Sequence, residues 1–139
     1  MIRNIVFFML ITLSFSAFAQ KEKSDVYAFT GLDVKPEYPG GNQAFYKYIN
    51  MNFRTPEVNE DIMAKVYVSF VIEKDGTMSS IKILRDPGYG MGKEAERVLL
   101  SCKEKWSPGL KNGVPVRVSY NLPITINVKS PPKEAVKKE

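Results

Sequence analysis

Few side chains in this sequence have the type and spacing that a reaction centre needs. The chain contains one cysteine, Cys102, and no histidine, so the thiol lacks the base that usually activates a nucleophilic cysteine. Glu94 and Glu96 are two positions apart on an expected helix, where such neighbours diverge and do not form a carboxylate pair. The lack of histidine also removes the commonest metal ligand. We therefore expect a protein that is not an enzyme and that has no cofactor and no metal site.

The backbone between Val116 and Val128 is a better candidate, because it predicts a long strand whose edge can form hydrogen bonds. Apolar and polar residues alternate with a period of two, which is typical of a strand with one face on a core and one in water. The apolar positions are Val116, Val118, Tyr120, Leu122, Ile124, Ile126 and Val128. No later segment is expected to cover the edge of this strand, although Pro123 withholds one N–H from it. The edge could therefore accept an added strand.

Two further strands and a helix are expected to support this strand. Residues 64–73 and 78–85 alternate in the same way, and Asp75-Gly76 between them tolerates the positive φ angles of a hairpin turn. The glycines and prolines of residues 36–41 end any earlier element. A helix then begins near Gly41 or Asn42, with Asn42 as its cap. Its buried face is predicted to comprise Ala44, Phe45, Tyr48 and Ile49.

A second helix is predicted by a stripe of apolar residues at helical spacing. The stripe consists of Met91, Ala95, Val98, Leu99, Cys102 and Trp106. Pro108-Gly109 should end this helix, and Asn112-Gly113 should turn the chain into the last strand. Trp106 could stack on a ligand, but its place in the stripe favours a core position that fixes the helix to the sheet. Cys102 is expected to be a buried structural cysteine.

The N-terminus predicts export. Arg3, an apolar run over residues 5–15 and Ala17-Phe18-Ala19 are together typical of a cleavable signal peptide, residues 1–19. An uncleaved membrane anchor is the alternative, although the run is short for a transmembrane helix. Residues 20–35 form an N-terminal arm, in which residues 26–34 could be either a short strand or a linker on the surface. Residues 36–129 form one domain, and the charged residues 130–139 are expected to be disordered.

Several motifs occur in an order and spacing that resemble the TonB C-terminal domain family. They are Pro36-Glu-Tyr-Pro-Gly-Gly41, Glu73-Lys-Asp-Gly76, Glu94-Ala95, Trp106-Ser-Pro-Gly109, Asn112-Gly-Val-Pro-Val116 and Leu122-Pro-Ile124. The likeness covers residues 36–128 and looks like the form common in Bacteroidetes-type envelopes. It implies an α+β fold, a three-stranded antiparallel sheet with two helices packed on one face.

The resemblance also implies a partner and a compartment. Domains of this family act in the periplasm, where they bind a short extended segment, the TonB box, of an outer-membrane TonB-dependent transporter by strand addition. Carried over by position, the partner-binding strand comprises Arg117, Val118, Ser119, Tyr120, Asn121 and Leu122. A second contact is implied for the loop with Phe53, Arg54 and Pro56, in which Thr55 stands where the family has an aromatic residue.

Two alternative functions are compatible with the same residues. An uncleaved anchor would make the chain a short TonB-like energy transducer, although about 20 residues before the domain extend only about 70 Å. A structural envelope protein could instead use the strand edge to form a homodimer, or could bind peptidoglycan. Nucleic acid is not an expected partner, because the net charge of +5 is mild and basic residues are interspersed with acidic ones. No small-molecule substrate is expected.

Overall fold

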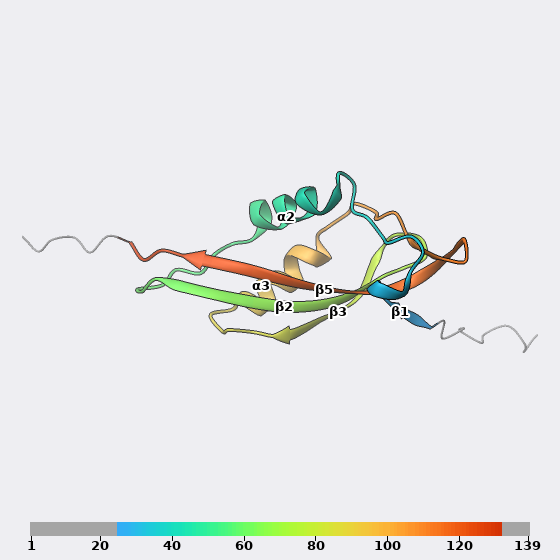
Figure 1. The fold of residues 1–139 in the computed structure, drawn as a ribbon. Coiled ribbons are helices and arrows are strands. Elements are labelled where there is room, and N and C mark those ends of the chain that lie inside the picture. The colour runs from blue at the N-terminus through green and yellow to red at the C-terminus, as the bar shows by residue number, and fades with distance from the viewer. Residues whose placement is uncertain (1–24, 132–139) are drawn as a thin grey trace, which may run out of the picture.

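The computed structural model describes residues 25–131 (Figure 1). The elements follow in the order β1 (Val26–Ala28), η1 (Phe29–Gly31, a 3-10 helix), α2 (Gly41–Asn52), β2 (Ile62–Ile72), β3 (Met78–Arg85), α3 (Met91–Leu100), β4 (Gly109–Lys111) and β5 (Val114–Val128). The predicted signal peptide and the first part of the arm lie outside the described residues, as does most of the predicted tail. Among the described residues, no helix has the length and apolar character needed to cross a membrane.

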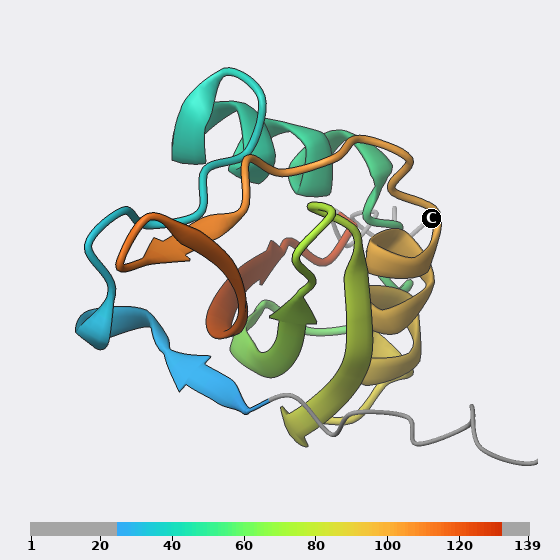
Figure 2. The same ribbon diagram turned by 90° about the vertical axis from the view of Figure 1, so that its right-hand side faces the viewer.

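The sheet is built around β5. Its strand order is β1-β5-β2-β3, and β4 also pairs with β5. The ladder between β2 and β5 is antiparallel and runs from Ile62 opposite Val128 to Ile72 opposite Val118. The predicted α+β fold with three long antiparallel strands is therefore confirmed, and the two short strands β1 and β4 extend it. Figure 2 shows how strongly the sheet curls around the core.

The core follows from the alternation of apolar residues in the two longest strands. The buried members of β2 are Val66, Val68, Phe70 and Ile72, and those of β5 are the seven even-numbered residues from Val116 to Val128. Both helices pack on this face, α2 through Phe45 and Ile49 and α3 through Ala95, Val98 and Leu99. Burial of these side chains supplies the main driving force for folding, at about 25 cal/mol per Å² of apolar surface.

The start of α2 differs from the prediction. Gly40, not Asn42, is the residue before the helix, and no side chain caps it. The N–H of Gly41 donates instead to the carbonyl oxygen of Tyr38 at 2.7 Å. Two successive glycines with positive φ make this backbone turn accessible, so the amide of Asn42 is not needed as a cap.

The end of α3 also differs from the prediction. The helix ends at Leu100, well before Pro108-Gly109, and residues 102–106 form neither helix nor strand. Long-range backbone bonds explain this, because the N–H of Trp106 donates to Gly76 O at 2.9 Å and that of Ser107 to Glu37 O at 2.8 Å. Cys102 therefore lies just beyond the helix and is half-buried, whereas Pro108 comes directly before β4.

Trp106 occupies the centre of the core, as predicted, with 2 % of its surface exposed. Four aromatic rings surround it, with centroids 4.8 to 6.1 Å from its own; they belong to Tyr38, Phe45, Phe70 and Tyr120. Within the described residues, its buried Nε1 has no hydrogen-bond partner. The side chain thus connects both long strands, α2 and the segment after α3.

Both predicted turns are present. Asp75 accepts hydrogen bonds from the N–H and the hydroxyl of Thr77, and Gly76 has a φ of +83°. Asn112 and Gly113 have φ values of +50° and +75°, as a two-residue hairpin turn between β4 and β5 requires. Gly109 is buried, and its position has no room for a side chain, because a Cβ there would lie 2.7 Å from a methyl group of Val118. Asp75, Gly76 and Gly113 therefore form the turns that the sequence predicts, whereas Gly109 begins β4 and does not end the helix.

The described chain is held to the domain as far as Ser130. Its N–H and hydroxyl donate to Asp61 Oδ1, and Lys129 Nζ donates to Asp61 Oδ2 at 2.8 Å. These bonds lower the pKa of Asp61 to about 2, with the Lys129 bond as the largest cause.

Candidate protein-interaction site

One edge of β5 is open over residues 120–127. β2 pairs with the opposite edge over the whole span from Val118 to Val128. On the side away from β2, β1 runs parallel to β5 and pairs with Arg117, Val118 and Ser119. Beyond these, no strand within residues 25–131 pairs with that side of residues 120–127, which we call the open edge.

The ladder with β2 determines which backbone groups face the open edge. In an antiparallel pair, alternate residues direct N–H and C=O to the partner strand, and the intervening residues direct them to the other side. Pro123 has no N–H and lies opposite Tyr67 within the ladder, so it belongs to the residues that face away from β2. Asn121, Thr125 and Asn127 therefore present both N–H and C=O to the open edge, and Pro123 presents C=O alone.

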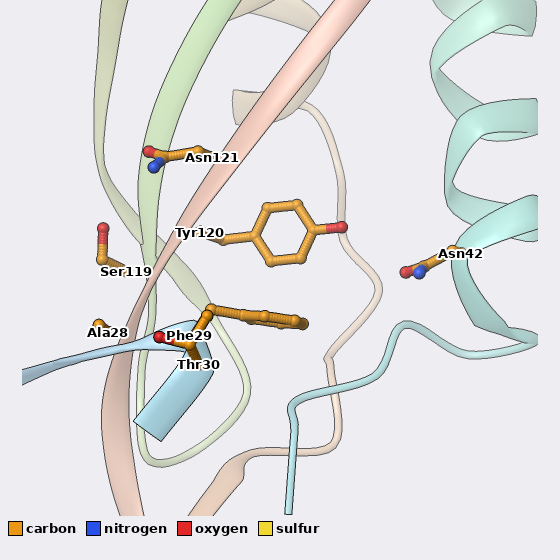
Figure 3. A pocket seen from close by; sticks show the side chains of 7 residues that line it. All are labelled: Ala28, Phe29, Thr30, Asn42, Ser119, Tyr120 and Asn121. Atoms are coloured by element: carbon orange, nitrogen blue, oxygen red, sulfur yellow. The ribbon is translucent and has the colours of Figure 1, made fainter. Parts of the chain in front are cut away.

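A pocket of about 460 Å³ lies where β1 ends and the open edge begins (Figure 3). Its lining includes Phe29, Asn42 and Tyr120. The rings of Phe29 and Tyr120 meet edge to face at 5.2 Å. The Tyr120 hydroxyl points toward the side chain of Asn42 (Figure 3), and burial raises the pKa of Tyr120. The pocket thus offers aromatic surface together with a neutral hydroxyl and an amide.

The predicted contact loop lies at the other end of the open edge. Phe53 and Thr55 share a smaller cavity, of about 150 Å³, with Asn50 and the strand residues Ile124, Thr125, Ile126 and Asn127. Phe53 packs against the core, and Pro56 is half-buried while Arg54 is exposed. The loop therefore borders the part of β5 beyond Leu122.

Glu94 on α3 fixes this loop. Its Oε1 accepts hydrogen bonds from the backbone N–H of Arg54 at 2.8 Å and from Arg97 at 2.6 Å. Arg97 in turn donates to the carbonyl oxygen of Asn52 at 2.7 Å. The Arg97 bond, followed by the Arg54 N–H, lowers the pKa of Glu94 to about 2.

Glu94→Gln should lower the unfolding free energy by about 1 kcal/mol at pH 7, because it removes charge-assisted bonds at a partly exposed site. The folded-state pKa lies below the ordinary value of 4.5, so ionised Glu94 stabilises the fold above that value. The difference from wild type should shrink as the pH falls toward 2. Urea unfolding at several pH values measures this. Glu96→Gln, an exposed neighbour on the same helix, should change little; equal effects of the two variants would contradict the assignment.

The structure divides the predicted partner-binding residues into two groups. Arg117, Val118 and Ser119 already pair with β1, and Arg117 also forms a salt bridge with Glu73 at 2.8 Å. Tyr120 and Leu122 bury their side chains in the core, and Asn121 is exposed on the outer face. The backbone that remains accessible continues past Leu122 to Asn127, beyond the predicted stretch. The alternation up to Val128 was the sequence signal for this longer site.

Fold and site together define a class of protein, a small α+β domain that leaves one edge of its longest strand open to another chain. The chain belongs to the family described as Gram-negative bacterial TonB protein C-terminal, whose model matches residues 57–127, just over half of the sequence. A search of curated proteins found no match. Membership assigns the protein to the Gram-negative envelope and to a TonB-like protein-interaction role. The matched region contains the whole open edge, whereas α2 and the loop at Phe53 precede it.

Proposed function

We propose that this protein binds an extended segment, the TonB box, of outer-membrane TonB-dependent transporters as an added strand on the open edge of β5. The observation that carries the proposal is that β2 pairs with only one side of residues 120–127 and that β1 stops at Ser119 on the other side. Eight residues of strand span about 27 Å, which is long enough for a short peptide segment. Membership of the TonB C-terminal family supports a transporter of the envelope as the partner.

The open edge and the two cavities beside it would select a particular kind of segment. Backbone hydrogen bonds to Asn121, Thr125 and Asn127 would give affinity for any extended chain, while alternate side chains would give selectivity. Side chains on the α2 side of the new strand would meet the pocket at Tyr120 and the smaller cavity at Phe53. An aromatic or apolar residue near each end of the segment matches these two sites.

We place this binding in the periplasm, and it requires no catalysis. The signal-like residues 1–19 and the envelope family support export to the periplasm. Strand addition requires no reacting side chain, so we assign no catalytic role to any residue. The intact mass of the protein in a periplasmic extract is the check, since a chain that begins at Gln20 supports export with cleavage. Retention of residues 1–19 would favour an anchored transducer.

Thr125→Pro most directly tests whether the open edge is the docking site, which we call the docking edge when it includes the residues paired with β1. Proline at this position removes an N–H that faces the open edge and leaves the ladder with β2 intact, so the domain should fold normally. Loss of one backbone hydrogen bond, with its partner carbonyl left unsatisfied, costs about 1–3 kcal/mol. Binding of synthetic peptides that cover transporter N-terminal segments should therefore weaken about 5- to 150-fold, as measured by calorimetry.

Thr125→Val is the matched control, because it keeps the N–H and the β-branched shape and should bind as the wild type does. NMR shift mapping with the same peptides should show changes along residues 120–127. Shifts confined to other surfaces, or equal affinities for the proline and valine variants, would exclude the open edge as the docking site. Light scattering that shows dimers, with no peptide binding, would point to self-association through this edge.

A further inference from the structure

The strand β1 lies on the edge of β5 that the proposed partner would use. Val26, Tyr27 and Ala28 pair in parallel with Arg117, Val118 and Ser119. The open edge begins at the next residue of β5, so β1 and the open edge lie end to end along one side of the strand. An added strand longer than the open edge would meet β1 at this point.

The short helix η1 turns the chain away from β5 just where β1 ends. Phe29 packs against Tyr120 of β5. The Lys35 Nζ lies over the Phe29 ring, 5.4 Å from its centre. Lys111 Nζ donates to the carbonyl oxygen of Gly31 at 2.9 Å. These contacts place η1 beside the pocket at Tyr120, where it closes one end of the open edge (Figure 3).

The attachment of β1 is weak compared with that of β2, the long strand on the other side of β5. It has three paired residues, whereas the ladder between β2 and β5 has eleven. All three β1 side chains are exposed, Val26 by 44 % and Tyr27 by 37 %. A segment with few buried apolar contacts opens locally at a small fraction of the cost of global unfolding. β1 can therefore leave β5 while the rest of the sheet stays folded.

We propose that β1 and η1 form an intramolecular competitor that occupies part of the docking edge and is displaced when a transporter segment binds. The inference rests on the proposed function, since it concerns regulation of the same edge. Release of β1 extends the accessible edge from residues 120–127 back to Arg117. For a strand that needs this longer edge, the apparent dissociation constant equals the intrinsic one divided by the fraction of molecules in which β1 is released.

A disulfide between β1 and β5 tests this. Ala28 and Ser119 are register partners, and both belong to the lining of the pocket at the junction of β1 and the open edge (Figure 3). The variant is Ala28→Cys with Ser119→Cys in a Cys102→Ser background, in the full chain. Oxidation with glutathione disulfide should weaken binding of the transporter N-terminal peptides at least about tenfold relative to the same protein after reduction. Equal affinities in the two states would overturn the inference.

The matched control locks a pair of strands that does not border the docking edge. Ser69→Cys with Lys82→Cys, in the same background, links register partners on β2 and β3. Its affinity should not change on oxidation. A tenfold loss in this control as well would show that the lock acts through general rigidity, which would overturn the inference.

Hydrogen exchange gives a second readout on the wild-type chain. Peptide binding should speed exchange of the Val26, Tyr27 and Ala28 amides and slow exchange of the amides at Asn121, Thr125 and Asn127. Slower exchange in β1 on binding would show that β1 stays in place, against the inference. If the peptides bind neither the oxidised nor the reduced lock, the docking proposal itself fails and this inference falls with it.

Discussion

Trp106→Ala should lower the unfolding free energy by about 3–5 kcal/mol, the usual cost of emptying a large aromatic site in a core. The side chain is almost fully buried and touches rings from β2, β5 and α2. Its removal therefore leaves a cavity where three elements meet. Because single domains are stable by only about 5–15 kcal/mol, the variant should be close to its unfolding midpoint at moderate urea concentrations. Far-UV circular dichroism with urea measures the change.

Trp106→Phe is the control for this prediction. Phenylalanine keeps an aromatic ring in the cluster and removes the indole N–H, which has no hydrogen-bond partner among the described residues. Phenylalanine thus removes an unsatisfied buried donor, and this gain in stability offsets part of the stability lost with the packing of the indole ring. We expect a cost of about 1–2 kcal/mol, clearly smaller than for alanine. Equal costs for the two substitutions would show that the ring contacts are not the source of the stability.

Gly76→Ala should be nearly as damaging, at about 3–5 kcal/mol, for two separate reasons. Gly76 has a φ of +83°, which L side chains rarely adopt. A Cβ at this position would also lie 1.9 Å from the carbonyl oxygen of Trp106, a backbone atom that cannot rotate away. The β2–β3 turn would have to separate from the segment that carries Trp106. Urea unfolding gives the loss of stability.

Gly113→Ala separates the two reasons. Gly113 has a similar φ of +75°, but nothing lies within 4 Å of a Cβ built there. The substitution should therefore cost only the backbone strain, about 1–2 kcal/mol. A Gly113→Ala cost as large as that of Gly76→Ala would mean that strain alone, and not the contact with Trp106, explains both results.

Most of the architecture could be predicted from local patterns. The period-two alternation of β2 and β5 identifies their buried faces, because a strand with one wet face must alternate. Asp75-Gly76 and Asn112-Gly113 identify the turns, since few other pairs accept positive φ. In each case the physical cause acts within a few residues, so the sequence contains the necessary information.

The misplaced end of α3 has a non-local cause. The apolar spacing continued from Leu99 through Cys102 to Trp106, and Lys103, Glu104 and Lys105 are all good helix formers. Backbone bonds from Trp106 and Ser107 to segments at Gly76 and Glu37 nevertheless keep this stretch from continuing the helix. Tertiary contacts of this kind override local propensity and cannot be read from the spacing.

The candidate site could be predicted only in part. β5 and the loop at Phe53 were both expected to contact the partner, and the structure places them along one edge. The pairing of Val26 with Arg117 joins residues about 90 positions apart in parallel, and a three-residue strand has too little pattern to reveal it. The sequence therefore left residues 26–34 open between strand and linker, and it could not show that β1 covers the first half of the predicted stretch.

The position of Trp106 also makes the protein its own optical probe. It is the only tryptophan in the chain, and its dry surroundings imply emission at short wavelength in the folded state. Its ring lies 5.3 Å from that of Tyr120, which in turn lies 5.2 Å from Phe29 of η1. The fluorophore is thus two ring contacts away from the segment that closes the docking edge, and unlabelled protein can report both its unfolding and changes at that edge.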